Sequence, residues 1–238
     1  MRIKNISVAI LMAISLTSLF SCGPGNSKGQ PLDDSINAGK EHQLTSSVAT
    51  AKEVELPSEE RVILNDFFSF FSMVYLKPFT KGTLSDHEMI RFAVYHNYRN
   101  NDKVFLPSAD GLKARISTTY IDETTLRFFG KKVAKPQSVD DIVFKNGFYE
   151  IDQAGGEAFS FSQLSNFTDN GDSTFTAYLN IYTASSGWSG NTNATPEEWI
   201  RSDGDEKPDL TGNMKATVKR VEEDGLSRFV LIEYIDVK

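Results

Sequence analysis

The chain has 238 residues, a net charge of −7 at neutral pH and a single cysteine, Cys22, and its apolar and charged fractions are those of an ordinary globular protein. One cysteine excludes an intramolecular disulfide, a CxxC redox pair and a zinc site built from cysteines. The negative charge argues against nonspecific nucleic-acid binding, which needs a basic surface to neutralise phosphates.

The beginning of the chain has the pattern of an export signal. Arg2 and Lys4 give a short positive start, and residues 6–20 form an apolar run broken only by Ser and Thr. A helix of about 15 residues is roughly 22 Å long, shorter than the ~30 Å hydrocarbon core of a bilayer. Residues 1–21 are therefore interpreted as a signal peptide rather than as a permanent membrane span.

Cys22 directly follows this run, in the stretch Leu19-Phe20-Ser21-Cys22. The stretch resembles the lipobox of bacterial lipoproteins, with Leu19 at position −3 and Ser21 at position −1. The resemblance implies that Cys22 becomes the lipidated first residue of the mature protein, anchored by acyl chains in the cell membrane or outer membrane. Two alternatives stay open: a secreted protein that is cut elsewhere, and a catalytic thiol, which needs an adjacent base and a shaped pocket.

Residues 23–56 are rich in Gly, Ser, Asn and mixed charges and show no sustained apolar periodicity. Together with Cys22 they are predicted to form a flexible tether over residues 22–56, with a root-mean-square span of roughly 30 to 35 Å. No acidic cluster directly follows Cys22. Because surface-exported lipoproteins of some bacteria carry such a cluster, we expect the anchor to face the periplasm.

Two helices are predicted at the start of a domain that spans residues 57–238. The first begins after Pro57, has apolar side chains at helical spacing, and ends near Pro78. The second runs to about Asn97 and begins with a capping box, in which Ser85 and Glu88 satisfy backbone amides at the helix start.

A third helix and a series of strands follow. The helix begins at Ser117 or at Asp122 and ends at Gly130. Farther along, β-branched and aromatic residues alternate or cluster, and the segments 169–172 and 222–225 have the composition of hairpin turns. The predicted strands are 148–151, 158–167, 173–183, 214–221 and 227–237.

This order of elements predicts a single α+β domain, in which two to three N-terminal helices pack on a curved antiparallel sheet of about five strands. The order is similar to that of the cystatin-like and nuclear-transport-factor-like rolls. Such folds host enzymes, binding modules and interaction domains, so the resemblance implies no particular function.

The titratable residues form no recognisable catalytic set. His87 and His96 are nine residues apart on one predicted helix and so face opposite sides of it. His96 is interpreted as interacting with the helix dipole, and a role as the acid or base of a pocket is the alternative. The acidic stretch 203–209 does not match a calcium loop, and no nucleophile, phosphate-loop or zinc-protease motif occurs. No catalytic residue, cofactor or metal ligand is predicted.

Two tryptophans lie in a long stretch between strands, over residues 183–213. Thr195-Pro196-Glu197-Glu198 is a capping box, which predicts a short helix that carries Trp199. Long loops are often functional, and an exposed Trp188 could stack on a sugar or a peptide. The alternatives are that Trp188 folds over the sheet edge and that Trp199 packs its helix on the core. Trp188, Trp199 and His96 are therefore the candidate ligand-binding residues.

Three functions remain open. The preferred hypothesis is a lipid-anchored envelope module that binds an envelope protein, peptide or glycan through the concave sheet face and the Trp188 loop. The second is a small-pocket enzyme in which His96 and a carboxylate act as acid and base, and the third is a structural or inhibitory module. A deep polar pocket containing His96 would favour the enzyme, a solvent-exposed Trp188 beside Tyr or Asp side chains would favour the binding module, and a convex sheet face with neither feature would favour the third.

Overall fold

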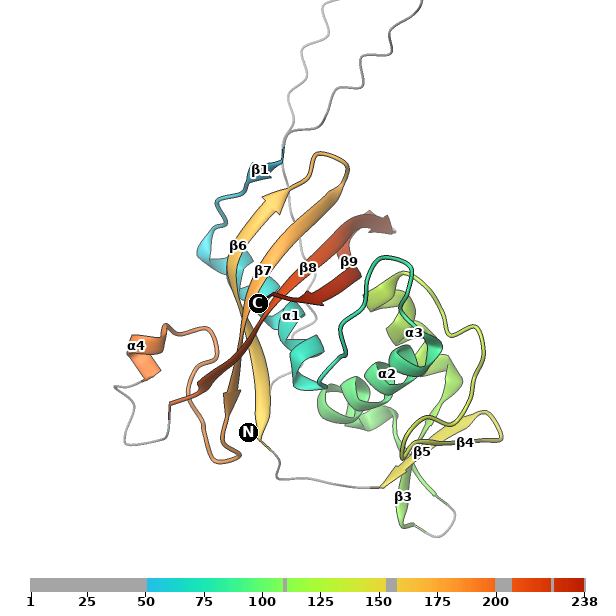
Figure 1. Cartoon of the computed structure of the whole chain (residues 1–238). Helices are drawn as coiled ribbons and strands as arrows, with labels where there is room; N and C mark the ends of the chain where they lie inside the picture. Colours follow the sequence, from blue (N-terminus) through green and yellow to red (C-terminus); the bar gives the residue numbers. More distant parts are fainter. Residues whose placement is uncertain (1–50, 109–110, 153–157, 200–206, 224, 238) are drawn as a thin grey trace, which may run out of the picture.

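The structure is a computed structural model that describes residues 51–108, 111–152, 158–199, 207–223 and 225–237. It contains helices and two antiparallel sheets (Figure 1), so the predicted α+β class is confirmed. The predicted signal peptide, Cys22 and nearly all of the predicted tether lie outside the described residues. No helix within the described ranges is long and apolar enough to cross a membrane.

The large sheet joins five antiparallel strands. Their order in space is β1 (Lys52–Glu53), β6 (Phe159–Asp169), β7 (Thr174–Ala184), β8 (Asp209–Glu223) and β9 (Leu226–Asp236). Gly171 and Gly225 have positive φ angles of 79° and 75° in the turns that join β6 to β7 and β8 to β9. Both hairpins were predicted from their turn residues, because such φ angles favour glycine.

The small sheet has four strands in the order β2 (Leu106–Pro107), β3 (Lys113–Ser117), β5 (Phe148–Asp152) and β4 (Val143–Lys145). Of these, the sequence predicts only β5, and the expectation that β5 joins the later strands in one sheet is wrong. The other three strands have two to five residues, which is too short for a clear alternating pattern. The small sheet buries Ile116, Tyr149 and Ile151 in the main core.

Helix α1 (Ser58–Met73) lies along one face of the large sheet and packs against β6, as Figure 1 shows. Its polar side chains also bond the backbone of that strand. Asn65 Oδ1 accepts from the Leu164 N–H at 2.7 Å, and Ser69 Oγ accepts from the Ser162 N–H at 2.9 Å. Beyond the short β1, these side chains of α1 take the place of a neighbouring strand along the edge of β6.

Helices α2 (Asp86–Asn100) and α3 (Thr118–Phe129) pack on each other, and α3 also contacts β9. The start of α2 is confirmed, because Ser85 Oγ accepts from the Glu88 N–H at 3.2 Å. The start of α3 is the earlier of the two predicted positions. Its end is confirmed at Gly130, whose φ of 68° is the left-handed conformation that glycine adopts after a helix.

Residues 51–56, which the composition assigns to the tether, contact the fold. Lys52 and Glu53 form β1 by pairing with the end of β6. The Val54 N–H donates to the Phe167 carbonyl at 2.8 Å, and the side chains of Val54 and Leu56 pack against the core. Two apolar residues in a polar stretch make no periodic pattern, so the predicted boundary at residue 57 misses this contact.

Candidate functional site

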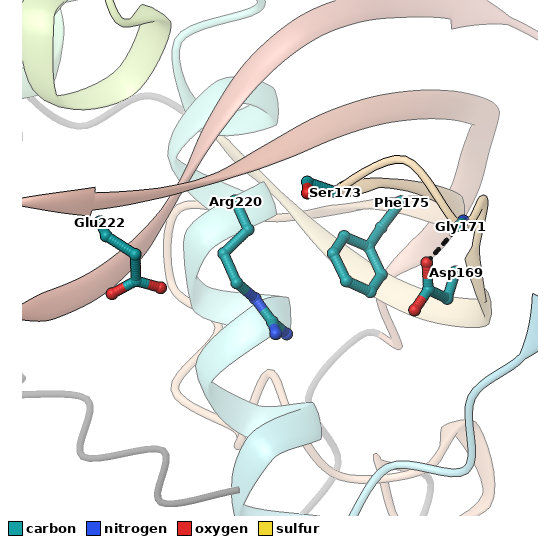
Figure 2. A pocket seen from close by; sticks show the side chains of 6 residues that line it. All are labelled: Asp169, Gly171, Ser173, Phe175, Arg220 and Glu222. Carbon is teal, nitrogen blue, oxygen red and sulfur yellow. Dashed lines mark hydrogen bonds between the residues drawn. The ribbon is translucent and has the colours of Figure 1, made fainter. Parts of the chain in front are cut away.

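A hollow of about 310 Å³ opens at one end of the large sheet, beside the β6–β7 turn (Figure 2). It lies on the face of the sheet that packs against α1, here called the inner face, because Phe175 in its wall also belongs to the main core. The lining residues are Asp169, Gly171, Ser173, Phe175, Arg220 and Glu222.

The β6–β7 turn forms one wall of the hollow. Asp169 Oδ1 accepts from the Gly171 N–H at 2.8 Å, which closes the start of the turn. Gly171 and Ser173 both have positive φ angles, of 79° and 66°. The Ser173 carbonyl accepts from the Arg220 N–H at 3.0 Å, so the turn is joined to β8 at the position that carries the arginine.

Arg220 is the cation of the hollow, and its guanidinium packs on aromatic rings. Its Cζ lies 4.8 Å from the ring centre of Phe175, toward which Figure 2 shows it pointing, and 5.4 Å from that of Phe229. Phe167 stacks on Phe175, with ring centres 5.2 Å apart. This packing restrains the side chain and stabilises its charge by cation–π attraction.

The charges of the hollow are not paired with one another. Among the described residues, no carboxylate lies within 4.0 Å of the Arg220 guanidinium, and its buried Nε has no hydrogen-bond acceptor. The carboxylates of Asp169 and Glu222 nevertheless line the same hollow. Donors and acceptors for a polar ligand are therefore present together.

The lining suits binding better than nucleophilic catalysis. Ser173 is its one hydroxyl, and no histidine lines the hollow, so no imidazole is placed there to activate that hydroxyl. Elsewhere in the part of the chain that the structure describes, no three His, Cys, Asp or Glu side chains converge in the way that metal ligands do.

Trp188 is buried, so the prediction of an exposed stacking platform is wrong. It is 6 % exposed, lies parallel to Phe161 at 5.7 Å between ring centres, and meets Trp199 edge-on. Phe161 and Tyr182 belong to the face of the sheet opposite the inner face, and they need an apolar cover. The loop supplies that cover with Trp188, while Gly190 allows its close approach, because a β-carbon there would collide with the indole. The alternative that the loop folds over the sheet is confirmed.

Trp199 is held by helix α4 (Pro196–Trp199) in the same cluster. One of the two bonds of the predicted capping box is present, since the Thr195 N–H donates to the Glu198 carboxylate at 2.8 Å. Trp199 is 2 % exposed, and its indole N–H donates to the Asn191 carbonyl at 2.8 Å. A role for Trp199 in direct ligand contact is therefore corrected to one in packing the short helix.

Polar side chains tie the Trp188 loop to the rest of the fold. Gln163 Nε2 donates to the carbonyls of Thr192 and Ala194 at 2.7 and 2.8 Å. Asn193 Oδ1 accepts from Asn65 Nδ2 on α1 at 2.9 Å. The Trp188 loop thus covers the face of the large sheet opposite the inner face and is also bonded to α1 on the inner face. This is a structural role.

His96 is surrounded by phenyl rings and not by acids. Its ring centre lies 4.8 Å from that of Phe70 and 4.6 Å from that of Phe128, and the Asn100 amide is 3.5 Å from Nδ1. Desolvation, and secondarily the charge of Arg127, lower the pKa of His96 to about 3. The ring is neutral at neutral pH and forms no ion pair within the described residues. The interpretation of His96 as a charge at the helix dipole and its alternative role as an acid or base are therefore both replaced by a role in packing the core.

The burial of His96 predicts that stability falls as the pH decreases below about 6.5. In the unfolded chain the His96 imidazole binds a proton near pH 6.5, whereas in the folded chain it binds one only near pH 3. The contribution of His96 to the free energy of unfolding is therefore complete above about pH 6.5, and it decreases by roughly 1.4 kcal/mol per pH unit below that pH. The free energy of unfolding should be measured by urea titration at about pH 7.5 and about pH 5. His96→Phe should reduce the pH-dependent loss by roughly 2 kcal/mol, whereas His87→Gln on the same helix should not. An unchanged pH dependence in His96→Phe would contradict this prediction.

Arg220 and the hollow were missed at the level of sequence, although one signal was present. In the strand that contains it, Met214, Ala216 and Val218 alternate inward and are buried. The next inward position is Arg220, so a cation stands where the pattern calls for an apolar side chain. The partners Asp169 and Phe175 lie directly opposite each other across the β6–β7 hairpin.

Comparison with known proteins finds no family model, no curated protein and no solved structure that matches the chain. The resemblances to bacterial lipoproteins and to the two roll folds therefore stay predictions. The role of the hollow has to be inferred from its own side chains.

Proposed function

We propose that the protein is a lipid-anchored binding module of the bacterial cell envelope, with the hollow around Arg220 as its ligand site. The stretch Leu19-Phe20-Ser21-Cys22 supports the anchor, and the residues that follow it favour the periplasmic side of the cell membrane or outer membrane. The observation that carries the binding role is the Arg220 guanidinium, which is held on two phenyl rings beside a hollow and has no ion-pair partner among the described residues.

Arg228 shows how a structural arginine behaves in the same sheet. Its guanidinium donates to the Glu223 carboxylate at 2.8 Å and to the carbonyls of Leu126 and Arg127 at 3.3 and 2.7 Å. Those bonds join the β8–β9 hairpin to the end of α3. Arg220 has no comparable bonds in the described part of the chain, so an external anionic group would supply the partner that its guanidinium lacks.

Photo-crosslinking tests whether this end of the inner face binds a ligand in the envelope. A photoreactive phenylalanine derivative at Lys52 would lie beside the hollow, because Lys52 is exposed and is the cross-strand partner of Asp169. After irradiation of intact cells, mass spectrometry of the purified protein should detect an adduct near residue 52. Arg220→Gln should reduce its yield about tenfold or more, as expected for the loss of a charge-assisted hydrogen bond.

Tyr178 is the matched control position. It is 39 % exposed and lies on the opposite face of β7 from Phe175. The same derivative at Tyr178 should give no adduct that depends on Arg220. If neither position yields an Arg220-dependent adduct, the binding proposal is wrong and the structural or inhibitory module is favoured.

A further inference from the structure

The hollow is lined by side chains of both charge signs. Arg220 and Glu222 lie two positions apart on β8 and share its inner face, and Asp169 lies on the other side of Arg220 and Phe175, at the start of the β6–β7 turn (Figure 2). Resting on the function proposed above, we infer that the hollow binds a small zwitterion of the α-amino acid class, with a carboxylate on Arg220 and an ammonium group on Glu222.

Arg220 provides the carboxylate position. A guanidinium presents a planar set of N–H donors that match the two oxygens of a carboxylate, and its packing on Phe175 and Phe229 reduces the conformational entropy lost on binding. The buried Nε leaves the terminal N–H groups as the donors available to a ligand in the hollow. Because Arg220 makes no ion pair with the described residues, its guanidinium can bind an anion without first giving up a carboxylate partner.

Glu222 provides the ammonium position, and Asp169 adds negative charge on the other side of Arg220 (Figure 2). Asp169 uses Oδ1 for the Gly171 amide, which leaves Oδ2 as an acceptor. The Glu222 carboxylate accepts no hydrogen bond from the side chains or amides that the structure describes, and it is exposed. A ligand that is only an anion is repelled by these two carboxylates, and one that is only a cation is repelled by Arg220, whereas a zwitterion has an oppositely charged partner for each of its two groups.

The size and polarity of the hollow favour a small ligand. Its volume of about 310 Å³ is at the lower limit of the range for ligand pockets, roughly 300 to 1,000 Å³. Phe175 is the one apolar side chain in the lining, and Arg220 covers its ring. The ligand is therefore recognised through its charged groups, with a small or polar side chain.

Equilibrium dialysis with radiolabelled L-alanine tests this inference on the purified full-length protein. Propionate and ethylamine are the matched competitors, because the first lacks the ammonium group and the second lacks the carboxylate. L-alanine should bind saturably, and each competitor should displace it at least about tenfold less well than unlabelled L-alanine. Arg220→Gln should abolish binding, and Arg220→Lys should weaken it, because lysine keeps the charge without the planar fork.

Two further variants separate charge recognition from loss of folding. Glu222→Gln should weaken L-alanine binding and at the same time make propionate a better competitor relative to L-alanine. Unfolding cannot produce this pair of effects, because it would weaken the binding of both compounds. Lys219→Gln, one position before Arg220 and on the opposite face of β8, should leave binding unchanged.

The outcomes distinguish this inference from the proposed function. If L-alanine does not bind saturably, or if the three compounds compete equally, the zwitterion inference is overturned. Should the derivative at Lys52 still give an Arg220-dependent adduct in that case, the hollow remains a binding site for another ligand class. Without that adduct, the inference and the proposed function both fail.

Discussion

Replacing Phe71 with alanine is expected to lower the free energy of unfolding by about 3 to 5 kcal/mol. Phe71 is fully buried, and its ring contacts aromatic rings from four different elements. These are Phe67 in α1, Phe92 in α2, Phe128 and Phe129 in α3, and Tyr234 in β9, with ring centres 5.1 to 6.3 Å from that of Phe71.

The effect is large because the surrounding residues cannot easily fill the space that the ring leaves. They belong to three helices and a strand that are each held in place by other contacts, so the cavity persists and its cost adds to the lost transfer free energy. A loss of this size is a large part of the roughly 5 to 15 kcal/mol that stabilises a typical domain.

Urea unfolding followed by circular dichroism measures the change. Val62→Ala is the control on the same helix, because Val62 is 39 % exposed, and its cost should stay within about 0.5 kcal/mol. If Phe71→Ala does not fold, Phe71→Leu leaves a smaller cavity and should show a smaller loss in the same direction. A cost below about 1 kcal/mol for Phe71→Ala would contradict the central place of this ring in the core.

Replacing Cys22 with alanine is expected to abolish lipid attachment entirely. The thiol is the group that would carry the acyl chains, and no second cysteine exists in the chain. Each buried methylene contributes about 0.8 kcal/mol, so the loss of two or more chains removes essentially all of the predicted anchoring energy. Radiolabelled palmitate should be incorporated into the natural sequence and not into Cys22→Ala, and a mature Cys22→Ala chain should move to the soluble fraction.

A double variant, Cys22→Ala with Ser27→Cys, tests whether lipidation depends on the position of the cysteine as well as on its thiol. It restores one cysteine outside the stretch that resembles a lipobox. We expect no palmitate incorporation. Incorporation in Cys22→Ala, or in the double variant to the level of the natural sequence, would show that the Leu19–Cys22 stretch does not direct lipidation.

The local parts of the fold are predicted well because their causes are local. Ser85 caps α2 through an amide three residues away, Gly130 ends α3 through its own φ angle, and the Glu198 carboxylate accepts from the Thr195 N–H at the start of α4. The hairpin turns at Gly171 and Gly225 belong to the same class. In each case the stabilising bond or dihedral angle involves residues within one turn of the chain.

The candidate site residues are predicted poorly, because burial depends on partners that are distant in sequence. Trp188 has no apolar neighbours along its loop, yet it stacks on Phe161 once the sheet has formed. His96 has the residue type of an acid or base, but three helices enclose it in phenyl rings that lower its pKa. A residue's type thus indicates what chemistry is available to it, and the surrounding rings decide whether that chemistry is used.

The sequence by itself determined the α+β class, the starts of α2 and α4, the end of α3 and the hairpin turns, since hydrogen bonds and φ angles within a few residues set all of these. Only the tertiary structure decided that the strands divide into two sheets, that Lys52 and Glu53 belong to the fold, and that Arg220 lies with Asp169 and Glu222 in one hollow. The physical reason is that strand pairing and burial join residues far apart in the chain, and the amide of Asn65 bonding that of Asn193 across 128 positions is an example.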